Sequence, residues 1–560
     1  MIVGIDLGTT NSLVAYFSPG GPKIIPNRLG KHLTPSIVSV DEDGNVYVGE
    51  TAKERMSLYP DSVASTFKRS MGSDREYVLS GKKYRAEELS SLVLKALKED
   101  AETFLGEPVT EAVISVPAYF DDQRRKATKR AGELAGLVVE RIISEPTAAA
   151  IAHGLYDQEG NCRFLVFDLG GGTFDVSILE LFENILEVRA VAGDNYLGGE
   201  DFTRVLEKLF LKDQKLDKQD MTLKEQARLY RSAEKAKCDF KDESEVIFSF
   251  VYKEEERKSV ITKRAYEEAC EELFTRIREP VKRSLSDAGL SLKDIDKVVL
   301  VGGATRLSIV KEFLIKLFRK FPDTSTNPDE AVALGAAIEG AMKERHGDVK
   351  EVILTDVCSF TLGTEVVVEY EDGRVEDGHF CPIIERNTVI PVSHTERLYT
   401  VRDNQEQVRV RVLQGESRFA RNNLYLGELN IKVPKAPKGQ EAIDVTYTYD
   451  INSLLEVQVE VVSTGEKQKM IIKGSQNTMS DEEIEKRMED LSYLKIQPRD
   501  QEENKVVLLR AERMYEECLG DRRKLIERYL QRFEEALHGG NRDEIREARE
   551  VLEDYLNEDD

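Results

Sequence analysis

The spacing of hydrophobic residues changes twice along the chain, and each spacing predicts a different kind of structure. In residues 1–346, short apolar runs alternate with stretches of helical period, which predicts an α/β region. Between residues 358 and 475 the apolar period becomes two, as in the run at 443–449, which predicts antiparallel strands. From residue 480 onward the period is helical again. The expected fold class is therefore multidomain α/β + β + α.

Two apolar runs in the first region end in the same way, on an aspartate followed by a glycine-rich turn. Residues 2–12 read IVGIDLGTTNS and residues 164–176 read FLVFDLGGGTFDV. Glycines without Cβ atoms let backbone N–H groups approach an anion, and threonine hydroxyls add donors. Either copy alone is also compatible with an ordinary hairpin. The repetition favours two related lobes whose turns hold a polyphosphate from opposite sides.

The aspartates at the ends of these runs predict a metal ion. Two carboxylates would repel a bare polyphosphate, so a divalent cation is expected between them. Asp6 and Asp168 are hard oxygen ligands of the kind that Mg²⁺ accepts.

Composition and charge narrow the classes of protein. A chain of 560 residues is too long for one core and suggests two or three domains. The formal charge of −24 argues against nucleic acid as a partner, because phosphate binding needs a basic face. Six scattered cysteines without a CxxC spacing argue against a zinc site or a disulfide scaffold and fit a reducing cytoplasm. No apolar run approaches the roughly 18 residues of a membrane span, so no membrane association is expected.

The order of the glycine motifs resembles the ATPase core of the actin and sugar-kinase superfamily and, more narrowly, the DnaK-type (70 kDa heat-shock) chaperone family. The strings that carry this resemblance are GIDLGTTNS at 4, TPSIVSV at 34, VISVPAYF at 113, SEPTAAA at 144, DLGGGTFDVS at 168, GDNYLGGEDF at 193, LVGGATR at 300, NPDEAVALGAA at 327 and VLQGE at 412. The likeness spans about the first 475 residues. The segments EVILTDV at 351, PIIERNT at 382 and LKIQPRD at 494 are most similar to the HscC branch.

The resemblance implies a fold and a function for the whole chain. Residues 1–346 would form a two-lobed, actin-like (duplicated ribonuclease-H-like) ATPase domain, 347–357 an interdomain linker, 358–475 a β-sandwich substrate-binding domain and 476–560 a shortened helical lid. Slow ATP hydrolysis would allosterically control the binding and release of unfolded polypeptide segments. The linker would dock on the ATPase domain when ATP is bound, although its apolar run also fits the first strand of the next domain.

The resemblance also assigns roles in the nucleotide site. Lys68 would reach the terminal phosphate, while Glu145, Asp168 and Thr173 would order the attacking water. The expected nucleotide contacts are Gly8, Thr9, Thr10, Asn11, Gly170, Gly171, Gly172, Gly198, Gly199, Glu200, Glu234, Lys237, Gly302, Gly303, Arg306 and Asp329. The expected cofactors are ATP or ADP with Mg²⁺ on Asp6 and Asp168, and K⁺ is a further candidate ion. Cys238 stands where many relatives have a residue that packs on the adenine.

Further positions match the family's signal relay and peptide groove. The relay positions are Pro117, Arg125, Ile353, Leu354 and Asp356. The groove positions are Thr364, Val366, Val367, Leu398, Tyr399, Val401, Val408 and Val410. Leu398 and Tyr399 depart from the DnaK pattern, so no sequence preference is transferred.

The partners implied by the resemblance are unfolded or extended polypeptides and a J-domain cochaperone that docks at Arg141 and Asp356. The segment between Lys241 and Ile261 is shorter than in DnaK, which leaves the exchange factor open. A helix from Pro328 through Lys343, capped by Asn327, is expected to close the ATPase domain.

Two other classes of protein share the predicted core. A small-molecule kinase would need a substrate pocket and a base between the lobes, and it would leave the β-region unexplained. A filament-forming, actin-like protein is the second alternative.

Overall fold

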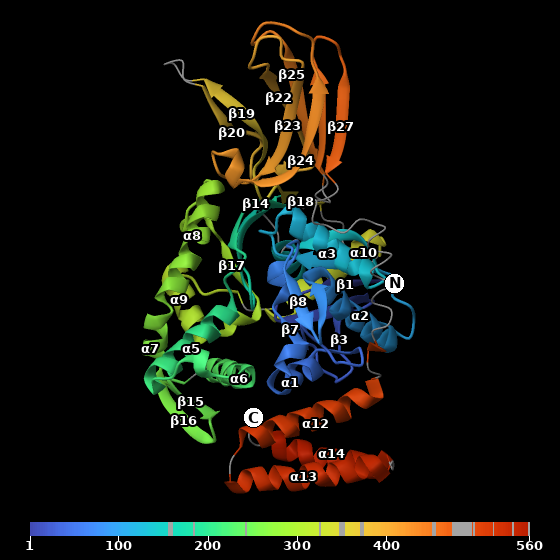
Figure 1. The fold of residues 1–560 in the computed structure, drawn as a ribbon, viewed down its shortest axis with the longest axis vertical. Coiled ribbons are helices and arrows are strands. Elements are labelled where there is room, and N and C mark those ends of the chain that lie inside the picture. Colours follow the sequence, from blue (N-terminus) through green and yellow to red (C-terminus); the bar gives the residue numbers. More distant parts are fainter. Residues whose placement is uncertain are drawn as a thin grey trace.

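The computed structural model describes residues 1–154, 161–182, 185–240, 243–323, 326–346, 353–369, 375–450, 455–472, 495–496, 499–518, 520–539 and 542–557. The expected linker residues 347–352 and the first part of the expected lid, 476–494, lie outside these ranges. Figure 1 shows β-sheets at one end of the long axis, two lobes in the middle and helices at the other end. Within the described ranges, no helix is long and apolar enough to cross a membrane.

The first lobe is built on a mixed sheet with the strand order β11-β10-β1-β2-β3. Its strands are β1 (Ile2–Asp6), β2 (Asn11–Ser18), β3 (Gly21–Ile25), β10 (Glu111–Val116) and β11 (Val138–Ser144), and β4 (Thr34–Pro35) also pairs with β2. A smaller sheet contains β28 (Lys495–Ile496), β6 (Asn45–Val48), β5 (Ile37–Val40) and β7 (Val63–Ser65). The helices of this lobe are α1 (Glu50–Leu58), α2 (Ala86–Leu105) and α3 (Asp122–Leu134), and β8 (Glu76–Leu79) pairs with β9 (Lys82–Arg85).

The second lobe repeats the arrangement on a sheet with the order β17-β12-β13-β14-β18-β21. These strands are β17 (Lys297–Val301), β12 (Cys162–Leu169), β13 (Phe174–Phe182), β14 (Ile185–Asp194), β18 (Ile353–Val357) and β21 (Val389–Ile390). Around them lie α5 (Gly199–Gln214), α6 (Leu223–Asp239), α7 (Lys263–Ala269), α8 (Glu271–Asp287), α9 (Ser308–Phe318) and the hairpin of β15 (Glu245–Tyr252) and β16 (Glu255–Thr262). β12 is almost wholly buried, which explains its continuous apolar run.

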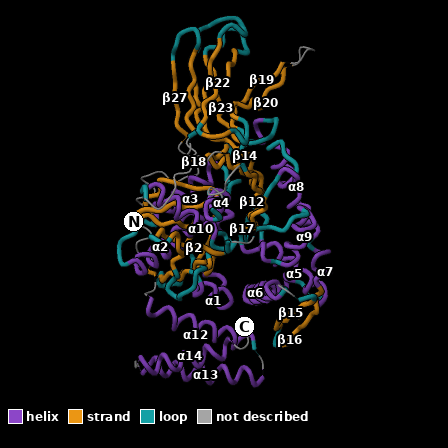
Figure 2. The backbone as a smooth tube through the Cα atoms, turned by 180° about the vertical axis from the view of Figure 1, so that it is seen from behind, coloured by secondary structure: helices purple, strands orange, loops and turns teal. Residues whose placement is uncertain are grey.

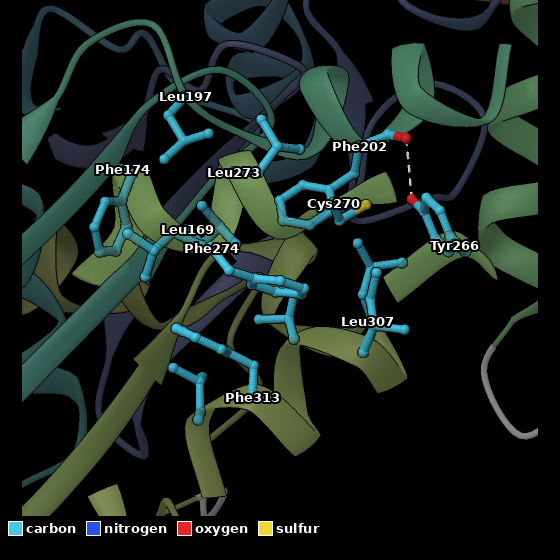
Figure 3. Close-up of a cluster of buried hydrophobic side chains, with 14 of the residues drawn as sticks. Leu169, Phe174, Leu197, Phe202, Tyr266, Cys270, Leu273, Phe274, Leu307 and Phe313 are labelled. Atoms are coloured by element: carbon cyan, nitrogen blue, oxygen red, sulfur yellow. Dashed lines mark hydrogen bonds between the residues drawn. The ribbon is translucent and has the colours of Figure 1, made fainter. Parts of the chain in front are cut away.

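The core of the second lobe is aromatic, and Figure 3 shows part of it. Phe274 and Phe313 stack with ring centroids 4.5 Å apart, and the Tyr266 hydroxyl donates to the Phe202 carbonyl at 3.0 Å. Cys270 is fully buried beside them, and burial raises the pKa of its thiol. Its place in the core gives this cysteine a packing role.

Two helices of small residues, α4 (Glu145–Ala152) and α10 (Ala331–Lys343), lie between the sheets of the two lobes. Alanines from both helices share one buried cluster with Val113 of the first lobe and Phe164 of the second. A Cβ on Gly335 would lie 1.8 Å from the Ala148 carbonyl oxygen, so α10 approaches α4 more closely than any side chain permits.

The helix that we expected to begin at Pro328 begins at Ala331 instead. Asn327 caps the turn that leads into this helix and not the first turn of the helix itself. The Asn327 side chain accepts from the backbone N–H of Asp329 at 3.2 Å, and its carbonyl accepts from Glu330 and Ala331. These bonds make a separate turn before the helix.

The β-region is a sandwich of two four-stranded sheets. One has the order β20 (Val375–Ile384), β19 (Leu362–Glu369), β23 (Gln407–Gln414), β24 (Leu424–Lys432). The other has the order β22 (Val392–Tyr399), β25 (Ala442–Tyr449), β26 (Leu455–Val461), β27 (Lys467–Ile472). Inward-facing residues such as Val445, Tyr447 and Val459 are fully buried between the sheets, as the period of two predicts.

The helices α12 (Arg499–Glu517), α13 (Gly520–Gly539) and α14 (Arg542–Asn557) form a bundle with its own core around Ile526, Phe533 and Leu552. α12 packs on α1, and both views place the bundle at the end of the molecule opposite to the β-sandwich. Figure 2 shows this separation from behind.

We expect Gly335→Ala to destabilise the protein by about 1–3 kcal/mol, because the added methyl group would overlap the Ala148 carbonyl. Thermal melting followed by circular dichroism measures the effect. Gly340→Ala on the same helix is the matched control. The nearest atom to its Cβ is a methyl group of Ile2 at 3.0 Å, which can move. Equal loss in both variants would contradict the close packing of α10 on α4.

Glu87 near the start of α2 gives a pH-dependent prediction. Its side chain is 3% exposed, and its Oε2 has no hydrogen-bond partner within the described residues. Burial raises the pKa of Glu87 to about 7. The folded state therefore binds this proton more tightly than the unfolded state, and stability falls as the pH rises from about 4.5 to about 7.

We expect Glu87→Gln to stabilise the protein by roughly 2–3 kcal/mol at pH 8 and by much less at pH 5. Melting curves at the two pH values measure the difference. The exposed Glu107→Gln serves as the control and should show no such difference. If Glu87→Gln stabilises the protein equally at both pH values, the ionisation of a buried Glu87 is not the cause of the stabilisation.

Candidate active site

A cavity of about 270 Å³ lies between the two lobes, and it brings most of the expected site residues together. The residues that line it are Asp6, Gly8, Thr9, Thr10, Asn11, Leu13, Leu33, Lys68, Glu145, Asp168, Gly170, Gly171, Thr173, Gly199, Glu200, Glu234, Lys237, Cys238, Val301, Gly302, Gly303, Ala304, Arg306, Leu307, Pro328, Asp329 and Val332. Of the expected nucleotide contacts, Gly172 and Gly198 lie outside this lining.

The glycine-rich turns of the two lobes touch each other at one edge of the cavity. A Cβ on Gly171 would lie 1.5 Å from Thr10 Oγ1, and one on Gly172 would lie 2.4 Å from Thr9 Cγ2. Gly198 is equally constrained, since its Cβ would lie 2.5 Å from the carbonyl carbon of Gly171. Gly171 and Gly172 thus allow the turns of the two lobes to approach each other, and Gly198 packs against the second turn within its own lobe.

Several polar atoms at this contact lack partners. The Oγ1 atoms of Thr9 and Thr10 are buried and make no hydrogen bond within the described part of the chain. A buried hydroxyl without a partner carries a desolvation cost that a bound oxygen atom would remove. These donors therefore fit an anion such as a phosphate group.

Carboxylates outnumber cations beside the turns. Lys68 is 3% exposed, and its Nζ donates to Glu145 Oε1 at 2.8 Å. Asp6 accepts from Ser115 Oγ at 3.0 Å. Burial, together with the nearby charge of Glu145, raises the pKa of Asp6 to about 7 and holds the pKa of Asp168 well above its ordinary value. A bound cation would relieve this repulsion.

The acidic residues do not form a metal cage by themselves. Among the described residues, no group of three or more His, Cys, Asp or Glu side chains is arranged to hold an ion. Mg²⁺ suits such an incomplete donor set, because it usually keeps several waters and takes one or two carboxylates plus substrate phosphates.

Asp175 is a member of this cluster that the sequence analysis did not single out. It stands opposite Asp168 in the pairing of β12 with β13, so both side chains point to the same face of the sheet. Burial, with the charge of Glu145, raises its pKa to about 8. The available signal is an acid between two apolar residues, Phe174 and Val176.

The other end of the cavity carries charged residues around an apolar wall. Lys237 Nζ contacts Glu234 Oε2 at 2.6 Å and the Gly199 carbonyl at 3.2 Å. Arg306 pairs with Asp329 at 2.8 Å. The apolar lining includes Leu33, Leu307, Val332 and the side chain of Cys238, an exposed residue whose thiol still has its pKa raised by partial desolvation. This wall has the character that a flat, aromatic base requires.

Three of the expected relay residues, Ile353, Leu354 and Asp356, belong to β18, and Arg125 lies on α3 beside it. Arg125 Nε and Nη2 donate to the carbonyls of Phe120 and Ala118, and its Nη1 lies 3.9 Å from Asp356 Oδ2. The Pro117 carbonyl accepts from the Phe120 N–H at 3.1 Å. Leu354 packs against the cluster between the lobes, and Ile353 pairs with Ile185 through the backbone.

β18 joins the second lobe to the β-sandwich. It pairs in parallel with β14 and antiparallel with β21. Beside it, Arg386 makes two hydrogen bonds of 2.9 Å to Asp287 at the end of α8, and Ser359 Oγ donates to the Ala118 carbonyl at 2.7 Å.

The expected groove residues lie on two sheets of the sandwich. Thr364 and Val410 are buried, Val366, Val367, Leu398 and Val408 are partly exposed, and Tyr399 and Val401 are 57% and 37% exposed. β19 pairs with β23 only from Leu362 to Thr364, whereas it pairs with β20 as far as Glu369. Beyond Thr364 the two strands therefore diverge.

Comparison with known proteins places the chain in a family. The family model described as Hsp70 protein matches residues 2–79 and 75–560. The chain is 42% identical over 503 residues to the chaperone protein DnaK of Thermotoga petrophila, Thermotoga neapolitana and Thermotoga maritima. The match covers 87% of this chain and 83% of each relative. These matches do not separate the HscC branch from the rest, so that assignment stays a prediction. The chain therefore belongs to the Hsp70 family of ATP-dependent molecular chaperones.

Proposed function

We propose that ATP is bound and hydrolysed in the cavity between the lobes and that the nucleotide state controls polypeptide binding by the β-sandwich. The observation that carries this proposal is the contact between the two glycine-rich turns, where Thr9 and Thr10 present buried hydroxyls without partners. Such donors suit the phosphates, and the apolar wall near Cys238 suits the base. Residues 1–346 would be the ATPase domain, 347–357 the linker, 358–475 the substrate-binding domain and 476–560 the lid. The described helices of this lid pack on the first lobe in this structure, away from the sandwich (Figure 1).

The side chains have distinct roles in the proposed hydrolysis. Lys68 places a positive charge for the terminal phosphate, and Glu145 fixes its position through their ion pair. Thr173 and Asp168 orient the attacking water, with little need for a strong base because the transition state is loose. Bound Mg²⁺ would neutralise phosphate charge. Asp6 and Asp168 are its proposed ligands, and K⁺ is a candidate for a second ion.

The proposed coupling to the sandwich runs through β18. This strand contacts β14 on one edge and β21 on the other, and Asp356 within it faces Arg125. A nucleotide that shifts Pro117 and Arg125 would change the fit of β18. Coupling between two binding sites is reciprocal, so ATP should weaken polypeptide binding and polypeptide should weaken ATP binding.

The proposed polypeptide site is the opening between β19 and β23. Glu365 of β19 and Arg411 of β23 pair across its base at 2.8 Å, and Glu369 at the end of β19 pairs at 2.6 Å with Lys438 in the loop between β24 and β25. An extended segment placed between them could hydrogen-bond to a strand edge and direct alternate side chains toward Val366, Val408 and Leu398.

Other partners follow from exposed residues. A J-domain cochaperone is proposed at Arg141, which pairs with Glu339 at 2.7 Å and keeps 34% of its side chain exposed, and at Asp356. The exchange factor is left open, and the cytoplasm is the proposed compartment. The family assignment favours a chaperone over a small-molecule kinase.

We expect Lys68→Ala to lower the rate constant of ATP hydrolysis by about 10²–10³-fold, because it removes the buried positive charge beside the phosphates. Release of phosphate to water measures this rate. The matched control is Lys53→Ala, an exposed lysine on α1, which should stay within twofold of the wild type. Similar rates for both variants would remove Lys68 from the mechanism, and transfer of phosphate to an added sugar would favour a kinase.

ATP is expected to lower the peptide affinity of the wild-type protein by a certain factor. We expect this factor to be less than a third as large in Arg125→Ala, because the substitution removes the contact between Arg125 and Asp356. Anisotropy of a fluorescent peptide with and without ATP measures the factor. Arg163→Ala, which removes a surface ion pair with Glu180, is the control. If ATP does not change the peptide affinity of the wild-type protein, the proposed coupling as a whole is contradicted.

A further inference from the structure

Glu54 on α1 binds two arginines that belong to two other parts of the chain. Its Oε1 accepts from Arg231 Nη2 at 3.0 Å, and its Oε2 accepts from Arg231 Nη1 at 3.1 Å and from Arg513 Nε at 2.7 Å. α1 belongs to the first lobe, Arg231 lies on α6 of the second lobe, and Arg513 lies on α12 of the C-terminal bundle. We call these three residues the ion triad.

The ion triad is shielded from water. The exposed fractions of the side chains are 5% for Glu54, 4% for Arg513 and 25% for Arg231. Burial alone would raise the pKa of Glu54, but the two guanidinium groups outweigh it and hold the pKa below its ordinary value.

Arg231 occupies a helix that also lines the candidate nucleotide cavity. Glu234 and Lys237 follow it at spacings of three and six residues on α6, and both face the cavity. Lys237 in turn contacts the Gly199 carbonyl of the second glycine turn. The bond from Arg231 to Glu54 therefore fixes the distance between α6 and the first lobe.

We propose that Arg513 is a positioning residue for the nucleotide cavity, which it stabilises by completing the ion triad that holds α6 against α1. The inference rests on the nucleotide site proposed above. With Arg513 in place, Glu54 is oriented by both arginines and closed off from solvent by α12. Without it, water reaches Glu54, and an ion pair exposed to water contributes little to holding the lobes together. The C-terminal bundle thus slows the opening of the cavity.

The test measures nucleotide release from the full chain. Stopped-flow dissociation of a fluorescent ADP analogue should be about five- to tenfold faster for Arg513→Ala than for the wild type. KM for ATP should rise by a similar factor, while kcat should stay within twofold, because Arg513 does not touch the reacting groups. Glu54→Gln, which keeps the side-chain volume, should act in the same direction. In the double variant, the release rate should increase by less than the product of the two single fold-changes. Arg513→Lys should release the analogue more slowly than Arg513→Ala.

Lys505→Ala is the matched control. Lys505 lies on the same helix, and its Nζ is 3.2 Å from the Tyr47 hydroxyl and 4.7 Å from the centre of the Tyr47 ring in the first lobe. This variant should change nucleotide release by less than twofold. Equal acceleration in Lys505→Ala and Arg513→Ala would assign the effect to helix docking in general and overturn the proposal. The proposal would also be overturned if Arg513→Ala and Glu54→Gln both release the nucleotide analogue at rates within twofold of the wild-type rate. If the proposed nucleotide site itself is wrong, the wild-type chain will not bind the analogue, and this result is distinct from the outcomes above.

Discussion

The close contact between the two glycine turns is the constraint on which the rest of the site depends. Gly171 and Gly172 lie so near to Thr10 and Thr9 that no Cβ fits between them. Each turn is anchored at the end of a buried strand, so the contact fixes where both aspartates and both threonine hydroxyls stand. It also fixes the remaining distance between the lobes, which α4 and α10 fill with alanine and glycine.

This geometry concentrates negative charge that the protein alone does not neutralise. Asp6, Glu145, Asp168 and Asp175 lie together in a buried region where Lys68 makes an ion pair with Glu145. Raised pKa values at three of these acids are the consequence of burial and mutual repulsion. The cavity is thus organised for a ligand that brings cations and phosphates together, and the lobes gain stability from closing around it.

Features set by local sequence could be predicted from the sequence, whereas features set by packing between distant segments could not. The strands that end on Asp6 and Asp168 follow from apolar runs broken by glycine, and the sandwich follows from the period of two. Asp175 escaped notice because an acid inside a strand usually faces solvent, and only the pairing of β12 with β13 places it beside Asp168. The start of α10 was misplaced because Asn327 directs its hydrogen bonds into a turn.

The contacts of the C-terminal bundle illustrate the same limit. The helical period from residue 480 onward predicts helices, and α13 and α14 do follow one another across the glycines near residue 540. Nothing in that period indicates which surface the bundle covers. Glu54, Arg231 and Arg513 each resemble a solvated charge on a helix, and their burial together is visible only in three dimensions.

The pairing between β18 and β14 involves few residues, and this has a consequence for solubility. β18 covers only the backbone of Ile185, Leu186 and Glu187. Release of this strand, which the proposed coupling involves, would uncover three further residues of β14, and the charged side chain of Arg189 follows them. An edge so short and so close to charge is a poor template for aggregation with another chain. Release and recovery of this strand would therefore add little new strand edge to which another copy could pair.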